Sequence, residues 1–296
     1  MRIYIDGDYI LYLIAARMQP TFYGVNDEWF NSKKEAVEAA SEACVDPINI
    51  TKLPCMMPPT LLPTYCEQAV DRLNASLKSR FGDDSHIIWG LSDEDNFRKE
   101  LYPEYKANRG EKPIYLPYIK RLVEEYTNSI KVPFMEMDDV IGQLVYQDKE
   151  PNIVVSVDKD LANLPTTLYN PSKNTVKDIT PAQGLKTFLI QVVTGDTVDN
   201  IKGVPGLGLV AATSIVPKIG AKFDPREVYE EFLVNLFNVA KEKNKQLDME
   251  KVLLDIVLLD VGGYYHKLLG LKHPNNGKHM ARCRNYVTNL LNNLRR

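Results

Sequence analysis

Four short apolar segments, each followed closely by an acidic residue, constrain the fold of this chain more than any other feature. The segments are residues 2–5, 87–91, 130–135 and 153–157, and the acids that follow them are Asp6, Asp93, Glu136 and Asp158. Short apolar runs bounded by polar residues are typical of buried strands, and the stretches between them have helical signals. This alternation predicts an α/β fold in which helices flank a mainly parallel central sheet.

The helical signals predict two domains. Helices are expected over residues 9–18, 33–43 and 65–81, and from Pro103 and Pro181 onward, where proline favours a first turn. Because the signals after about residue 181 are helical only, residues 1–181 are predicted to form the α/β domain and residues 182–296 a helical region. Residues 19–64 include a proline-rich stretch and are weakly patterned, so we interpret them as an insertion.

Composition narrows the class of protein. The chain has 296 residues, of which 44% are hydrophobic and 25% charged, as in ordinary globular proteins. No apolar run is long enough to cross a bilayer, and Asp6 lies too early for a signal peptide, so we expect a cytoplasmic protein that does not bind membranes. The cysteines Cys44, Cys55, Cys66 and Cys283 lack the paired spacing of a zinc ribbon or a disulfide framework, and reduced thiols are expected.

Carboxylates dominate the predicted site. Ligands of open α/β sheets bind beyond the C-terminal ends of the strands, where the first four acids would lie. Five more follow close by in the sequence, making nine in all: Asp138, Asp139, Asp160, Asp196 and Asp199. Like charges this close require cations, and a ligand set of oxygens alone suits Mg²⁺ or Mn²⁺. Two such ions would stabilise the attacking and leaving oxygens of a phosphodiester. The alternative is that these acids cap helices and end strands in solvent, which for Asp139 alone is an equally good interpretation.

A glycine-rich loop follows the last two acids. Its sequence is Gly203-Val204-Pro205-Gly206-Leu207-Gly208, directly after Lys202. Small residues let backbone N–H groups approach a phosphate, and a helix N-terminus is expected after the loop. A tight turn is the competing explanation. Two acids just before the loop favour phosphate binding, although no Lys-Ser or Lys-Thr pair follows, as a P-loop would require.

A basic segment carries the remaining candidates. Lys106 and Arg109 are three residues apart, so a helix beginning at Pro103 would present both on one face, where they could offset charge developing on a phosphate. Tyr105 could stack on a terminal base. The alternative is a solvated amphipathic face.

Seven motifs in order resemble the 5′→3′ exonuclease and flap endonuclease family, particularly its bacteriophage members. They are Tyr4-Ile5-Asp6-Gly7; Ser92-Asp93 with Phe97-Arg98; Pro103-Glu104-Tyr105-Lys106-Ala107-Asn108-Arg109; Met135-Glu136-Met137-Asp138-Asp139; Ser156-Val157-Asp158-Lys159-Asp160; Gly195-Asp196-Thr197-Val198-Asp199-Asn200; and Gly203 to Gly208. The resemblance implies a metal-dependent nuclease with a helical arch and a C-terminal helix–three-turn–helix element. Its substrate would be DNA with a 5′ end, a flap or a branch, or an RNA/DNA hybrid.

The resemblance also implies roles for single residues. Asp6, Asp93, Glu136 and Asp138 would hold the first metal ion, Asp158 and Asp160 would lie between the two ions, and Asp196 and Asp199 would complete the second site. Asp139 matches the second aspartate of its motif, and Asp6, Asp93 and Asp158 would be catalytic together with Lys106 and Arg109 at the base of the arch. Lys202, Gly203, Gly206 and Gly208 would grip duplex DNA, with a monovalent cation at this hairpin, and the protein would act as a monomer.

Two features depart from the family pattern. Val210 stands where family hairpins commonly carry lysine, and Pro113 and Pro117 would break helices in a segment that is short for an arch.

The charge pattern leaves nucleic-acid binding open. The net charge of −3 includes the nine proposed ligands, while residues 267–296 carry seven basic and no acidic residues and could contact phosphate or form a solvated tail. Two other classes remain as alternatives, an RNA-cleaving nuclease of the same α/β type and a non-catalytic protein that binds DNA structures. The glycine-rich loop argues against the first, and the complete set of acids against the second.

Overall fold

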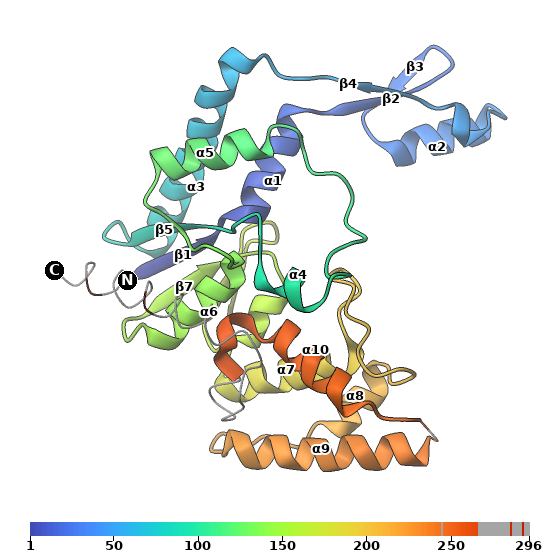
Figure 1. Ribbon diagram of the computed structural model, residues 1–296. Coiled ribbons are helices and arrows are strands. Elements are labelled where there is room, and N and C mark those ends of the chain that lie inside the picture. The colour runs from blue at the N-terminus through green and yellow to red at the C-terminus, as the bar shows by residue number, and fades with distance from the viewer. Residues whose placement is uncertain (244, 266–284, 286–291, 293–296) are drawn as a thin grey trace. The chain divides into compact units, whose positions relative to one another are not determined.

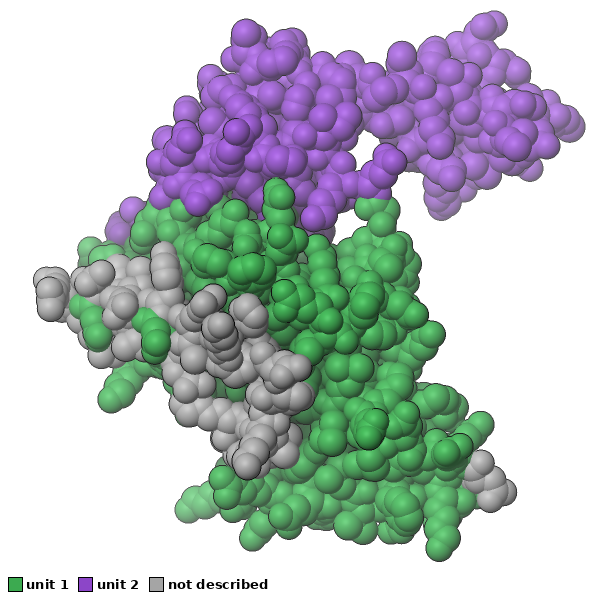
Figure 2. Space-filling model, in the orientation of Figure 1, with its two compact units in different colours: residues 1–8, 84–110, 128–296 green, residues 9–83, 111–127 purple. Residues whose placement is uncertain are grey.

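The computed structural model describes residues 1–243, 245–265, 285 and 292. The chain forms two compact units (Figure 2): one comprises Met1–Asp8, Asp84–Gly110 and Asn128–Arg296, and the other Tyr9–Asp83 and Glu111–Thr127. The predicted boundary near residue 181 is therefore corrected. The helices that follow it share a hydrophobic core with Tyr105, so they belong to the same unit as the sheet.

A six-stranded sheet is the centre of the first unit (Figure 1). Its order is β6 (Ser129–Lys131), β5 (His86–Leu91), β1 (Arg2–Asp6), β7 (Asn152–Val155), β8 (Thr167–Asn170) and β9 (Thr175–Asp178). All neighbours pair in parallel except β8 and β9, which are antiparallel. The predicted α/β class and mainly parallel sheet are confirmed, and β8 and β9 are additions that the sequence patterns did not predict.

The strand register brings the C-terminal ends of the central strands to one edge. Asp6 pairs with Gly90 of β5, and Ile5, one residue earlier, pairs with Val155 at the end of β7. On this edge begin helix α6 (Met137–Gln147) after β6 and the short 3₁₀ helix η3 (Asp160–Asn163) after β7. Helix α4 (Phe97–Leu101) follows β5. The carboxylates at the strand ends are thus held by a buried and rigid part of the fold.

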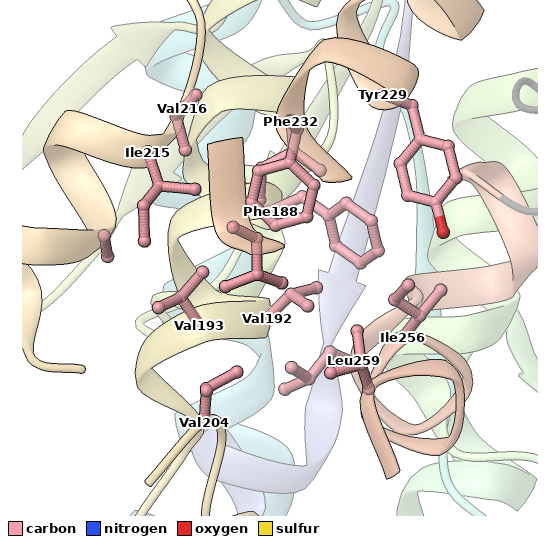
Figure 3. Packing of buried hydrophobic residues seen from close by; sticks show 14 of the residues in the cluster. Phe188, Val192, Val193, Val204, Ile215, Val216, Tyr229, Phe232, Ile256 and Leu259 are labelled. Atoms are coloured by element: carbon pink, nitrogen blue, oxygen red, sulfur yellow. The ribbon is translucent and has the colours of Figure 1, made fainter. Parts of the chain in front are cut away.

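The helices that follow the sheet in the sequence enclose an apolar core. These are α7 (Pro181–Thr194), α8 (Leu209–Ile215), α9 (Pro225–Glu242) and α10 (Met249–Leu259), after which comes the 3₁₀ helix η4 (Val261–Gly263). Phe188 and Val192 of α7 pack here with Phe232 and Ile256 (Figure 3). The predicted helix at Pro181 is confirmed, and it begins with a capping box in which the side chains of Thr180 and Gln183 bond each other's backbone N–H.

The second unit contains the segment that we interpreted as a weakly structured insertion. It holds most of α1 (Gly7–Met18), then β2 (Thr21–Val25), β3 (Glu28–Phe30), α2 (Lys33–Glu42), η1 (Pro47–Asn49), β4 (Thr51–Pro54), η2 (Pro59–Leu61), α3 (Leu62–Phe81) and α5 (Leu116–Tyr126). A three-stranded sheet with the order β3-β2-β4 forms here, and α2 packs Ala36 and Ala40 against Val25. The strands are only three to five residues long, too short to show a periodic apolar pattern.

The segment proposed as an arch contains one helix, α5. Pro117 lies in its first turn, where a missing N–H is tolerated, so it does not break the helix as predicted. Within the described residues, no helix is both long and apolar enough to cross a membrane.

Candidate active site

Asp6 is the last residue of β1 and is 9% exposed. The Ser156 hydroxyl, just beyond β7, donates to Asp6 Oδ2 over 2.7 Å, and Ser156 Oγ accepts the backbone N–H of Asp158 over 2.9 Å. Burial, followed by the negative charges of Asp8 and Asp158, raises the pKa of Asp6 from 3.8 to about 7. The side chain therefore lies in a place that lacks compensating positive charge.

Asp160 has a similar environment in η3. Its backbone N–H donates to Asp158 Oδ1 over 2.8 Å, which ties the two residues together. Burial and the charges of Asp158 and Asp196 raise the pKa of Asp160 to about 7. The side chain of Gln191, from α7, donates to Asp160 Oδ1 over 2.6 Å. Gln191 had no role in the sequence analysis, because nothing local marks a glutamine in an apolar helix.

Glu136 and Asp138 open α6 but differ in their surroundings. Glu136 Oε1 lies 2.5 Å from Lys106 Nζ, and Glu136 Oε2 lies 3.3 Å from a terminal nitrogen of Arg98. Burial alone would raise the pKa of Glu136, but Lys106 and Arg98 outweigh it and hold the pKa near 2. At Asp138, burial and the charge of Glu136 raise the pKa well above its ordinary value.

Asp139 is bound by Arg98, the residue that also contacts Glu136, and its predicted role as a metal ligand stays a prediction. Both of its oxygens accept hydrogen bonds from Arg98, one over 2.7 Å, and Oδ1 also accepts the backbone N–H of Gly262. Asp139 is 0% and Arg98 2% exposed, and Arg98 Nε donates to the carbonyl of Leu258. This buried pair joins α4, α6 and α10, so a metal ion at Asp139 would have to compete with Arg98.

The two acids beyond α7 are each paired with a basic side chain. Asp196 lies 2.8 Å from Lys159 Nζ and accepts the N–H of Val198. Burial raises the pKa of Asp196, but these contacts outweigh burial, so the pKa lies below its ordinary value. Asp199 Oδ1 lies 2.6 Å from Arg109, and its Oδ2 lies 3.6 Å from Lys106 Nζ.

The predicted helix from Pro103 is absent, because residues 103–108 form turns and Lys106 has a φ of +58°. Lys106 and Arg109 nevertheless meet at one site, since each contacts Asp199. Tyr105 is 4% exposed and donates to Glu136 and Asp199, so its ring is not available for the predicted stacking on a base.

Asp93 has contacts of its own beyond β5. Its oxygens accept the backbone N–H groups of Phe134 and Glu94, and Lys131 Nζ lies 3.4 Å away. Burial opposes these contacts, but together they lower the pKa of Asp93. The hydrogen bonds and ion pair found for Asp93 are thus to cationic or backbone groups and not to another acid.

Across the described residues, no group of three or more His, Cys, Asp or Glu side chains is arranged as a ready metal site. The chemistry of the donors nonetheless fits a divalent cation. Asp6, Asp138 and Asp160 have pKa values raised by burial and by neighbouring acids, and all their donor atoms are oxygens. Asp93, Glu136, Asp196 and Asp199 carry basic partners that a cation would compete with.

The glycine-rich loop combines two kinds of glycine. Gly203 has a φ of +61°, and a Cβ there would lie 2.4 Å from the backbone nitrogen of Gly195, so the turn itself requires glycine. Gly206 also has a positive φ, +76°. Gly208 differs, because its φ is −86° and a Cβ would have no neighbour within 4 Å. Lys202, 4.0 Å from Glu104, and Val210, 88% exposed, are open to solvent.

Comparisons with known proteins agree with this fold. Residues 64–188 match the family described as 5′-3′ exonuclease, N-terminal resolvase-like domain. The predicted resemblance to this family is confirmed.

The similar proteins have the names 5′-3′ exonuclease and DNA polymerase I. The chain is 33% identical over 159 residues to the 5′-3′ exonuclease of Buchnera aphidicola subsp. Schizaphis graminum, covering 48% of this chain and 55% of that protein. It is 30% identical over 185 residues to DNA polymerase I of Pseudomonas aeruginosa, covering 57% of this chain and 20% of that protein. The chain thus spans about half the length of the exonuclease and a fifth of the polymerase.

Solved structures of a bacteriophage T5 protein share the fold over nearly the whole chain. A structure obtained with metal ions superposes with a TM-score of 0.57 at 14% identity and covers 97% of this chain and 98% of that one. A complex of the T5 flap endonuclease with DNA and metal ions gives a TM-score of 0.56 at 15% identity, with the same coverage. At these identities the likeness shows the fold alone.

Proposed function

We propose that this chain is a divalent-metal-dependent 5′ nuclease that hydrolyses DNA phosphodiester bonds at 5′ ends, flaps or branched duplexes. The observation that carries the proposal is the set of acids with raised pKa values beyond the strand ends, Asp6, Asp138 and Asp160. Lys106 and Arg109 each contact Asp199, a further acid of the same proposed site. Relatives named 5′-3′ exonuclease and a T5 flap endonuclease with the same fold support it.

Mg²⁺ or Mn²⁺ fits the proposed donor set, and we infer two ions. Asp6, Asp138, Asp158 and Asp160 would hold them, with Asp93, Glu136, Asp196 and Asp199 as further ligands once their basic partners move. When bound, such ions stabilise charge on the phosphate and make an attacking water more acidic. They would also remove the repulsion that raises the pKa values of the buried acids.

Lys106 and Arg109 would exchange partners during the reaction. Lys106 Nζ lies 2.5 Å from Glu136 and 3.6 Å from Asp199. The ammonium group can therefore neutralise either carboxylate, or a phosphate that takes the place of one of these carboxylates. Arg109 has a side chain 47% exposed and contacts Asp199 at its terminal nitrogen, which leaves its outer face open to solvent. Both cations would offset charge in the transition state without leaving the site.

The loop between α7 and α8 would bind duplex DNA. Gly208 needs neither a positive φ nor the space of a missing Cβ, so its small size is explained best by the close approach of a ligand. Lys202, Gly203 and Gly206 would complete this surface, with a monovalent cation at the loop. The predicted basic tail, residues 267–296, lies outside the described residues except for Asn285 and Asn292. We propose a monomer in the cytoplasm.

Product sizing on 5′-labelled flap, nicked and blunt duplexes with Mg²⁺ tests the proposal. We expect cleavage near the 5′ end or the flap junction, and replacing Asp158 with Asn should reduce it by about a hundredfold or more while duplex binding remains measurable. Matched RNA and RNA/DNA flaps identify the alternative substrates. Cleavage that persists in EDTA, or full activity of Asp158→Asn, would contradict the assignment of the site.

A further inference from the structure

Gln191 contacts two of the acids that we propose as metal ligands. It lies on α7 and is 8% exposed, and its Nε2 donates to Asp160 Oδ1 over 2.6 Å and to Asp196 Oδ2 over 3.2 Å. One neutral amide therefore contacts two carboxylates, one from η3 and one from the loop after α7.

The orientation of this amide is fixed by another buried side chain. Asn163 is 1% exposed, and its Nδ2 donates to Gln191 Oε1 over 2.7 Å. Because the carbonyl of Gln191 is occupied by that donor, its NH₂ group faces the acids. Asn163 Oδ1 is buried without a hydrogen-bond partner, so the side chain bears a cost that its single bond to Gln191 offsets only in part.

A neutral donor differs from a cation in its effect on a metal site. A lysine or arginine at this place would satisfy the carboxylates and would compete with a bound ion. An amide positions both carboxylates without adding a positive charge. Lys159 Nζ does lie 2.8 Å from Asp196 Oδ2, but its side chain is 64% exposed, whereas the amide is held in place by Asn163.

We propose that Gln191, oriented by Asn163, is a positioning residue that holds Asp160 and Asp196 for a divalent cation and thereby sets the affinity of the site for that ion. The inference rests on the proposed metal-dependent function and deepens it. Groups that orient metal ligands from outside typically change affinity by about 10- to 100-fold when they are replaced.

Mn²⁺ titration of the full chain, followed by electron paramagnetic resonance of the free ion, tests this directly. Gln191→Met keeps the length of the side chain and removes the donor, and we expect its Kd for Mn²⁺ to rise about tenfold. Asn163→Leu should raise the Kd by a smaller factor. The double variant should bind as Gln191→Met does, because Asn163 acts only through Gln191.

The matched control is Gln143→Met. Gln143 is also a buried glutamine, 4% exposed, but its Nε2 donates to the backbone carbonyl of Gly262 rather than to an acid. Its Kd should equal that of the wild type, and thermal melting in EDTA verifies that every variant is folded.

The outcomes separate the two proposals. If the wild type binds Mn²⁺ and Gln191→Met binds it equally well, or if the effects at 163 and 191 simply add, the inference is wrong and the nuclease proposal stands. If the wild type does not bind Mn²⁺, both the metal site and this inference are overturned.

Discussion

Two regions of the candidate site treat their carboxylates in opposite ways. In the first, which we call the cation-paired side, Arg98, Lys106 and Arg109 contact Glu136, Asp139 and Asp199. In the second, the cation-poor side, Asp6, Asp158 and Asp160 are linked mainly by a hydroxyl, an amide and backbone N–H groups. On the cation-paired side, basic side chains neutralise the acids and hold parts of the fold together. On the cation-poor side, neutral donors contact the acids, and we propose that a metal ion binds there.

This difference explains why the pKa values diverge within one site. The pKa of Glu136 is lowered to about 2, whereas the pKa values of Asp6 and Asp160 are raised to about 7, although all three side chains are largely buried. Burial acts in the same direction on each of them, so the presence or absence of a basic neighbour decides the sign. A cation-poor cluster of this kind is the part of the site expected to respond most to added metal.

The largest effect on stability is expected from breaking the buried pair of the cation-paired side. Arg98→Met leaves Asp139 without its bidentate partner at 0% exposure, which should lower the free energy of unfolding by about 3–5 kcal/mol. Urea denaturation measures the change. Lys34→Met is the control: it removes an exposed ion pair with Glu38 and should cost at most about 0.5 kcal/mol. An equally small loss for Arg98→Met would show that the pair does not hold the helices together.

The pH dependence of stability tests the cation-poor side. Because the pKa of Asp6 is raised from 3.8 to about 7, the native state binds more protons than the unfolded state between these values. In EDTA, wild-type stability should therefore fall as pH rises from about 4 to 7. Asp6→Asn should lack this pH-dependent component. The free energy of unfolding of Asp6→Asn minus that of the wild type should therefore be roughly 1–3 kcal/mol larger at pH 8 than at pH 4.

Thermal and urea unfolding at several pH values measure that difference. Saturating Mg²⁺ should stabilise the wild type most at high pH, by about 2.7 kcal/mol at a hundredfold excess over Kd, and Asp6→Asn much less. A wild-type stability that rises over this pH range and does not change in Asp6→Asn would contradict the charge deficit.

The smallest effect sharpens the comparison at its boundary. Tyr105→Phe keeps the buried ring but removes the hydroxyl that donates to Glu136 and Asp199, and should cost about 1–2 kcal/mol of stability. Tyr126→Phe is matched to it, because that hydroxyl also donates to an acid, Asp71, but in an exposed position. Equal losses in the two variants would mean that burial adds nothing to the tyrosine's contacts.

The sequence predicted the parallel sheet and the acids at its strand ends because both follow from local patterns. Apolar runs ending at Asp6 and Asp158 mark buried strands, and parallel strands place their ends on the same edge. The strands in residues 19–64 were not predicted, because they are only three to five residues long and leave no periodic signal. Residues 103–108 were mistaken for a helix, whereas Lys106 has a positive φ and its backbone N–H donates to the carbonyl of Asp199, 93 residues away in the sequence.

The site shows the same division. By itself, the sequence determined which chemical groups come together, since the acids, Lys106 and Arg109 are fixed by their places along the chain. Only the tertiary structure decided which acids receive a cation from the protein. Arg98 binds Asp139, which is 41 residues away in the sequence. Gln191 contacts Asp160, 31 residues away, and Asp196, 5 residues away. The physical reason is that charge compensation depends on burial and on distances of a few ångströms between side chains, which no local pattern encodes.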